Sequence, residues 1–86
     1  MSQKTLNETD YFRSSDLALV TVLSLFYPVE AIDKESPAGR AYFLFLKDGD
    51  GFEETLRKYW SRQLVVEPQA FFSQLKIIKA RIFSGE

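Results

Sequence analysis

A short cationic and aromatic segment contains the side chains best suited to bind another molecule. Arg57, Lys58 and Arg62 stand beside Tyr59 and Trp60. Cations that follow a phosphate backbone, together with rings on which bases stack, are typical of proteins that hold nucleic acid. More cations follow near the end of the chain. The candidate nucleic-acid contacts are Arg57, Lys58, Arg62, Lys76, Lys79 and Arg81.

Two features weigh against this interpretation. Tyr59 and Trp60 also fall on the apolar stripe of a predicted helix, which favours a place in the core. The net charge is only −1, with five Lys or Arg against eight Asp or Glu in residues 1–50 and six against four in residues 51–86. A protein with so little net charge has no overall attraction for nucleic acid. Nucleic-acid binding is therefore the alternative function.

The acidic segment 48–54 is a candidate metal site, because alternating acids and glycines can wrap a hard cation. Its spacing does not fit an EF-hand, since the remaining ligand positions would fall on Leu46 and Arg57. Its carboxylates would also repel a phosphate. We interpret the segment as a strand-to-helix turn in which Asp50 is the N-cap and Glu53 completes a capping box. No metal or cofactor is predicted.

Catalysis is the least favoured function, because the chain has no His and no Cys. Acid–base chemistry would then need Asp, Glu, Lys or Tyr with shifted pKa values, and such shifts need burial that a small core offers in few places. The serines at positions 14, 15 and 24 have no identifiable base partner. We expect a protein that is not an enzyme and has no small-molecule substrate.

With 86 residues, the chain is long enough for one domain and one core. We expect a flexible tail over residues 1–11, a globular domain over residues 12–83 and a second tail over residues 84–86. The polar N-terminal segment is not a signal peptide, and the longest apolar run, residues 17–29, is too short to cross a bilayer. The absence of Cys is also unlike a small secreted scaffold. These features predict a cytoplasmic protein with no membrane contact.

The first predicted element is a helix over residues 17–26. A serine at position 14 or 15 can cap it, and Asp16 suits the positive end of the helix dipole. The helix stops before Pro28, which cannot continue it. Only Thr21, Ser24 and the first turn are polar, so the apolar face is wider than a surface helix needs. The helix is therefore either central to the fold or part of an interface.

A β-hairpin is predicted next, with residues 29–33 pairing with residues 42–46 across a polar loop at 34–39. Both faces of the second strand are apolar, so helices should cover one face, and the other is open to a further partner. A helix follows with Phe52, Leu56, Tyr59 and Trp60 in its apolar stripe. A last helix begins at Pro68, with its stripe at residues 71, 75, 78 and 82.

The predicted fold is therefore α+β, with a two-stranded antiparallel hairpin packed with three α-helices in the order αββαα. The segments 11–17, 42–45, 56–60 and 66–71 together resemble a small prokaryotic domain family of unknown function, found as stand-alone proteins. The resemblance covers residues 11–83 and implies helices around a hairpin, with no activity or cofactor to transfer. Tyr27-Pro28 departs from the Gly-aromatic pair expected there.

The function favoured by the sequence is a small non-enzymatic binding module that works through protein–protein contacts or self-association. A wide apolar helix face and an apolar strand face both favour a partner, because small domains rarely expose large apolar patches without use. The exposed edges of a hairpin can also pair with another chain. The predicted interface residues are Leu17, Thr21, Ser24, Tyr42, Leu44 and Leu46.

Overall fold

Three helices and a three-stranded antiparallel sheet form the structure, a computed structural model that describes residues 11–34, 40–47 and 49–83. The elements are β1 (Tyr11–Ser14), α1 (Leu17–Phe26), β2 (Ala31–Asp33), β3 (Tyr42–Leu46), α2 (Gly49–Trp60) and α3 (Pro68–Phe83). The predicted α+β class is confirmed. The predicted tails lie outside the described residues, apart from Tyr11.

The sheet has three strands in the order β1-β3-β2, so the predicted number of two strands and the predicted element order αββαα are wrong. The hairpin itself is present, because β2 pairs with β3 antiparallel and the Glu30 amide donates to the Leu44 carbonyl at 2.8 Å. β1 adds a third strand on the other side of β3, with Phe12 opposite Phe45 and Ser14 opposite Phe43. The first helix therefore follows a strand rather than a tail.

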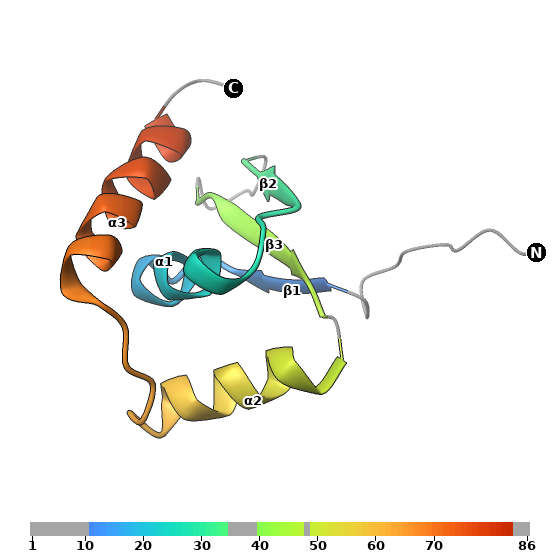
Figure 1. The fold of residues 1–86 in the computed structure, drawn as a ribbon. Helices are drawn as coiled ribbons and strands as arrows, with labels where there is room; N and C mark the ends of the chain where they lie inside the picture. Colours follow the sequence, from blue (N-terminus) through green and yellow to red (C-terminus); the bar gives the residue numbers. More distant parts are fainter. Residues whose placement is uncertain (1–10, 35–39, 48, 84–86) are drawn as a thin grey trace, which may run out of the picture.

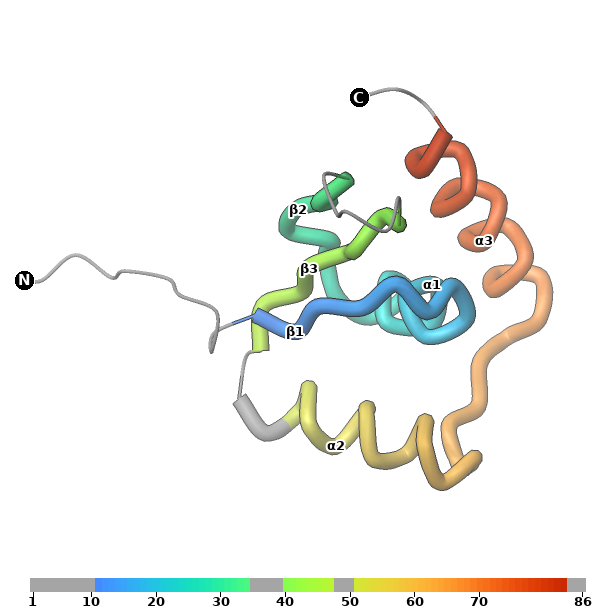
Figure 2. Tube along the Cα trace, turned by 180° about the vertical axis from the view of Figure 1, so that it is seen from behind, coloured from blue at the N-terminus to red at the C-terminus, as the bar shows by residue number. Residues whose placement is uncertain are grey.

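α1 lies against one face of the sheet, α3 packs beside α1, and α2 lies below α1 and β1 in both views (Figures 1 and 2). The N-cap of α1 is Asp16, whose Oδ1 accepts from the Leu19 amide at 3.2 Å. Ser14, one of the predicted caps, instead accepts from the Asp16 amide. The helix ends before Pro28, as predicted, with Tyr27 in an extended conformation.

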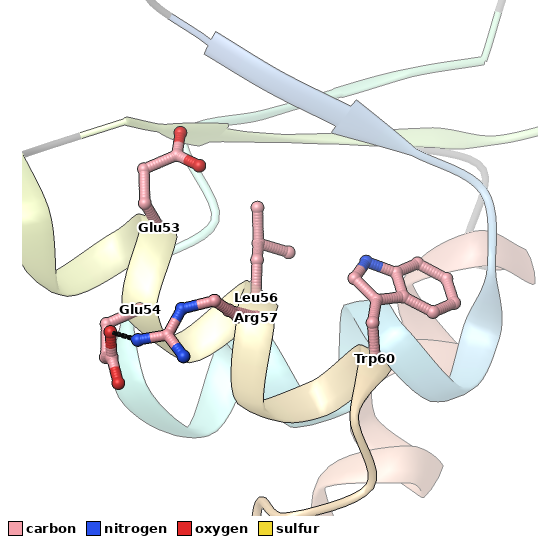
Figure 3. Close-up of a pocket in the computed structure, with 5 residues that line it drawn as sticks. All are labelled: Glu53, Glu54, Leu56, Arg57 and Trp60. Atoms are coloured by element: carbon pink, nitrogen blue, oxygen red, sulfur yellow. Dashed lines mark hydrogen bonds and ion pairs between the residues drawn. The ribbon is translucent and has the colours of Figure 1, made fainter.

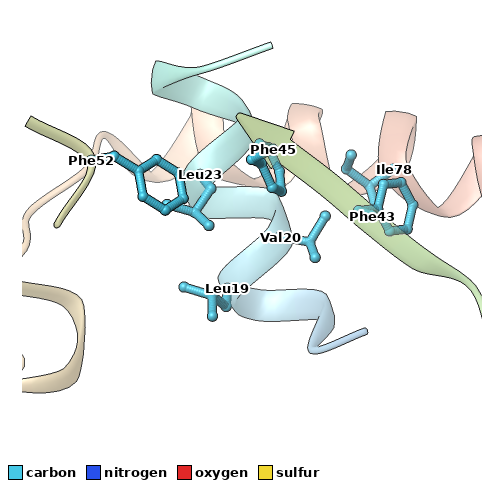
Figure 4. Packing of buried hydrophobic residues seen from close by; sticks show 7 residues of the cluster. All are labelled: Leu19, Val20, Leu23, Phe43, Phe45, Phe52 and Ile78. Atoms are coloured by element: carbon cyan, nitrogen blue, oxygen red, sulfur yellow. The ribbon is translucent and has the colours of Figure 1, made fainter. Parts of the chain in front are cut away.

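The core is built where α1 meets β3 (Figure 4). Phe43 and Phe45 point to the same face because side chains alternate along a strand, and both are buried. α2 contributes Phe52 and α3 contributes Ile78 to the same cluster. The wide apolar face of α1 is explained by this central position, and the buried α1 residues are Leu19, Val20, Thr21, Val22 and Leu23.

A chain of hydroxyl groups joins the end of α1 to α2. The Thr55 hydroxyl donates its one hydrogen to the Gly51 carbonyl at 2.9 Å. The 3.0 Å contact between the Tyr27 and Thr55 hydroxyls is therefore donated by Tyr27. The Tyr27 ring also packs on Phe52, with 5.1 Å between centroids. These contacts hold α2 against the core at its N-terminal half.

The predicted capping box of α2 is not formed as expected. α2 begins at Gly49, so Asp50 lies inside the helix instead of at its N-cap. Asp48 and the side chain of Asp50 lie outside the described part of the structure. At α3 the prediction is confirmed: Pro68 is the first residue, and the Glu67 carboxylate accepts from the Gln69 and Ala70 amides.

Candidate nucleic-acid interface

One side of the molecule is formed by the C-terminal end of α2, the connection at residues 61–67 and α3 (Figure 1). Residues 55–83 contain six Lys or Arg and a single carboxylate, Glu67, a net charge of +5. Residues 1–54 contain five Lys or Arg and ten Asp or Glu, a net charge of −5. The near-neutral total therefore conceals a separation of charge, and we call the side formed by residues 55–83 the cationic side.

α2 ends in a Schellman turn with an arginine at its left-handed position. The Gln63 amide donates to the Lys58 carbonyl at 2.8 Å, and the Arg62 amide donates to the Tyr59 carbonyl at 3.1 Å. Arg62 has φ of 66°, the one positive φ of a non-glycine residue in the described part. Glycine is the usual residue there because it has no Cβ to clash. A non-glycine residue in this left-handed conformation lowers the stability of the fold, and Arg62 occupies it here.

Trp60 is 64% exposed, so its predicted place in the core is wrong. It follows Phe52 by eight residues, which puts it about 80° around the helix from that buried ring. Trp60 is also at the last turn of α2, farthest from the Tyr27 contacts. Tyr59 remains half-buried and packs against the core. The apolar stripe therefore supplies one core ring and one surface ring.

A first hollow of about 500 Å³ lies along α2 (Figure 3). Leu56 and Trp60 point to the same side of the helix, whereas Arg57 points elsewhere and forms an ion pair with Glu54. Glu53 completes the lining. Two carboxylates make this hollow a poor site for an anion.

A second hollow, of about 520 Å³, lies between α1, the end of α2 and the connection. Its lining contains no carboxylate and one cation, Arg62. The Tyr59 and Trp60 rings meet there nearly at right angles, with centroids 5.0 Å apart and planes at 83°. The lining residues are Val22, Tyr59, Trp60, Arg62, Leu64 and Val66. We call this the Trp60 hollow.

The phenol of Tyr59 is kept neutral at this site. Burial of the ring, and then the negative charge of Asp16, raise the pKa of Tyr59 above its ordinary value, because both disfavour a phenolate. A neutral phenol can donate a hydrogen bond but is a weak base. Tyr59 therefore carries no charge at neutral pH.

α3 carries an exposed row of two aromatic and two cationic side chains on the cationic side, which we call the α3 row. Phe72, Lys76, Lys79 and Phe83 follow one another at spacings of four, three and four, so they share one face of the helix. Phe72 is 60% exposed and Phe83 is 81% exposed. Arg81 lies about half a turn around from Phe72, and its carbonyl accepts from the Lys34 amine at 2.8 Å. Arg81 is therefore on a different face from the two lysines.

The six predicted nucleic-acid contacts are thus divided among three places. Arg57 and Arg62 flank Trp60, one in each hollow. Lys58 is exposed on α2, outside both linings, and Lys76 and Lys79 share the α3 row. The signal that sequence analysis missed is the exposure of Trp60, Phe72 and Phe83 beside these cations.

The predicted interface residues on α1 do not form an open surface. Thr21 is fully buried, and its hydroxyl donates to the Leu17 carbonyl at 2.7 Å. The Ser24 hydroxyl donates in turn to the Thr21 carbonyl at 2.7 Å. Leu17 packs against the core cluster. A partner therefore cannot contact Thr21 in this fold.

The other predicted interface residues, Tyr42, Leu44 and Leu46, lie on the outer face of the sheet, away from α1. They are half-buried. Arg13 spans this face from β1 to β2, with an ion pair to Asp33 at 2.9 Å and its guanidinium carbon 4.0 Å from the centre of the Tyr42 ring. The two halves of the predicted interface are therefore separated by the sheet.

The described residues contain no cluster of three or more potential metal-ligating His, Cys, Asp or Glu side chains. None of the described helices combines the length and the apolar character needed to span a membrane. Comparisons with protein-family models, curated proteins and solved structures find no match to this chain. The resemblance to a small prokaryotic domain family therefore stays a prediction.

Proposed function

We propose that this protein is a non-enzymatic binding module that holds nucleic acid on its cationic side. The observation that supports this most strongly is Trp60, an exposed indole with Arg57 and Arg62 on its two sides. Stacking of a base on an aromatic side chain contributes about 1–3 kcal/mol and tolerates any base. The Arg62 guanidinium adds attraction for phosphate, whereas the Arg57 guanidinium is paired with Glu54.

The α3 row supports the same function, because Phe72 and Phe83 stand at the two ends of a pair of lysines. The row covers eleven residue steps, or about 16 Å of helix, enough for more than one phosphate of an extended strand. The charge of +5 over residues 55–83 supplies long-range attraction that the whole-chain charge does not suggest. Binding without sequence preference is expected from stacking and phosphate contacts alone.

The test is fluorescence anisotropy of a labelled oligothymidylate at about 50 mM salt. We expect binding that weakens with salt, with a slope of about 0.7 in log–log form for each phosphate contact. Trp60→Ala should weaken binding by a factor of about 5 to 150, from the loss of one stacked base. Lys79→Ala should lower the salt slope by about one contact. Lys47→Ala is the matched control, since Lys47 is exposed between β3 and α2, outside the cationic side.

Absence of binding at low salt would refute the proposal, as would equal losses in the Lys79 and Lys47 variants. The competing function is protein contact through the outer face of the sheet. It is favoured by one observation, the half-buried apolar residues Tyr42, Leu44 and Leu46 between edge strands β1 and β2. A concentration-dependent mass that Leu44→Lys abolishes would support that function instead.

A further inference from the structure

The Trp60 hollow is concave, and five of its six lining residues are apolar or aromatic. Its volume of about 520 Å³ lies within the range of about 300–1,000 Å³ found for small-molecule sites. Val22 forms part of its wall from α1, and Leu64 and Val66 form another part from the connection. A flat apolar group can therefore be enclosed from more than one direction.

The two rings in the hollow suit a planar occupant. Because the Tyr59 and Trp60 planes meet at 83°, a ring stacked on one of them presents its edge to the other. Stacked and edge-to-face contacts are both favourable arrangements of aromatic rings. The aliphatic side chains in the lining reduce the contact of such a ring with water. This geometry is suited to one unstacked aromatic group rather than to a continuous stack.

The lining carries one charged side chain, and Asp16, whose negative charge reaches Tyr59, is outside the lining. Arg62 is the cation, and no carboxylate lines the hollow, in contrast with the hollow that contains Glu53 and Glu54. The hydrogen bonds of the Schellman turn fix the backbone at Arg62, so the side chain extends from a Cα in a defined position. An aromatic ring attached to a phosphate matches this combination of apolar walls and one cation.

We propose that the Trp60 hollow takes one unstacked nucleobase of a bound strand, with the adjoining phosphate on Arg62. The inference rests on the proposed function and adds that the ligand is single-stranded. A base inside a duplex is paired and stacked, and extracting it costs a few kcal/mol. The protein should therefore bind a single strand more tightly than a duplex of the same length, by a factor of ten or more.

The test compares two neighbouring valines. Val66 lines the hollow, whereas Val65 is 85% exposed and outside it. Val66→Phe fills the hollow, and Val65→Phe adds the same atoms elsewhere. With oligothymidylate and its duplex with oligoadenylate as probes, we expect Val66→Phe to reduce single-strand affinity to the duplex level. Val65→Phe should bind both probes as the wild type does.

A second measurement needs no variant and covers the case in which Val66→Phe fails to fold. An abasic oligomer keeps the phosphates and lacks the bases, so wild-type affinity for it should fall to the duplex level. The single tryptophan, Trp60, should be quenched by oligothymidylate and not by the abasic oligomer. Equal affinity for oligothymidylate, duplex and abasic oligomer would overturn this inference and leave the proposed function intact. Absence of binding to all three probes would overturn both.

Discussion

Replacing Arg62 by glycine should make the protein more stable and weaken its binding at the same time. Arg62 holds φ of 66° at the end of α2, a conformation in which the Cβ of any other residue than glycine crowds the backbone. The hydrogen bonds of the turn involve backbone atoms of Lys58, Tyr59 and Gln63, so Arg62→Gly leaves them in place. Only the crowding and the guanidinium are removed.

The size of the gain follows from two opposing terms. The left-handed conformation costs a non-glycine residue about 1–2 kcal/mol. Glycine loses more backbone entropy on folding, by about 0.5–1 kcal/mol. We expect a net increase of about 0.5–1 kcal/mol in the free energy of unfolding of Arg62→Gly. For a domain of this size, that corresponds to a rise in Tm of roughly 2–8 °C.

Urea and thermal unfolding followed by far-UV circular dichroism would measure the change without relying on the nearby indole. Arg62→Ala is the control, because it removes the guanidinium and keeps the Cβ, so no gain in stability is expected. Both variants should bind oligothymidylate equally weakly. A stability of Arg62→Gly equal to or below that of Arg62→Ala would refute the reasoning about the turn. Unchanged affinity in both variants would refute the role of the guanidinium.

Three further outcomes follow from the packing. Phe43→Ala should lower the free energy of unfolding by about 3–5 kcal/mol, whereas Phe72→Ala, at a ring that is 60% exposed, should change it by less than about 0.5 kcal/mol; urea midpoints compare the two. Tyr27→Phe and Thr55→Val should each lower the free energy of unfolding by about 1 kcal/mol. A double-mutant cycle should show a coupling of at least about 0.5 kcal/mol between them, and additive effects would contradict the hydrogen bond between the two hydroxyls. Gly51→Ala should raise Tm through an increase of about 0.5 kcal/mol in stability, since its Cβ would lie 3.8 Å from the Tyr27 hydroxyl in ordinary contact; a lower Tm would contradict this.

The parts of the fold that sequence analysis predicted well are those with local signals. Pro28 ends α1 and Pro68 begins α3 because the proline ring itself restricts the backbone. β1 has no such signal: its four residues pair with β3, about thirty positions away. A strand this short is recognisable mainly through its partner. Ser14 was consequently assigned to a helix cap, although it belongs to β1.

The candidate site was only half predictable. The cations were evident from residue type, but the hydrophobic stripe of α2 does not say where the core ends. Phe52 and Trp60 belong to one stripe, and only Phe52 has α1 and β1 to pack against. The left-handed turn at Arg62 was not predictable, because the sequence there has no glycine to mark it. Without that turn, the Trp60 hollow could not be inferred.

The large apolar side chains exposed in the described part of the chain are unevenly distributed. Of the six large apolar side chains exposed in the described part, five lie between residues 60 and 83, and the sixth is Phe26. Surplus apolar side chains on an inert surface would show no preference for residues 55–83, the third of the chain with a charge of +5.

The effect of salt distinguishes the two functions that exposed aromatic and cationic side chains could serve together. Association through the rings alone, for example of two copies, buries apolar surface and is strengthened by sulfate. Capture of a polyanion releases counterions and is weakened by any added salt. The two functions therefore predict opposite effects of added sulfate. Sulfate should strengthen self-association, measured by sedimentation of the protein alone, and should weaken strand binding, measured by anisotropy of a labelled strand. The proposed function, with Arg62 and Trp60 lining one hollow, requires the second result, binding that weakens as sulfate increases.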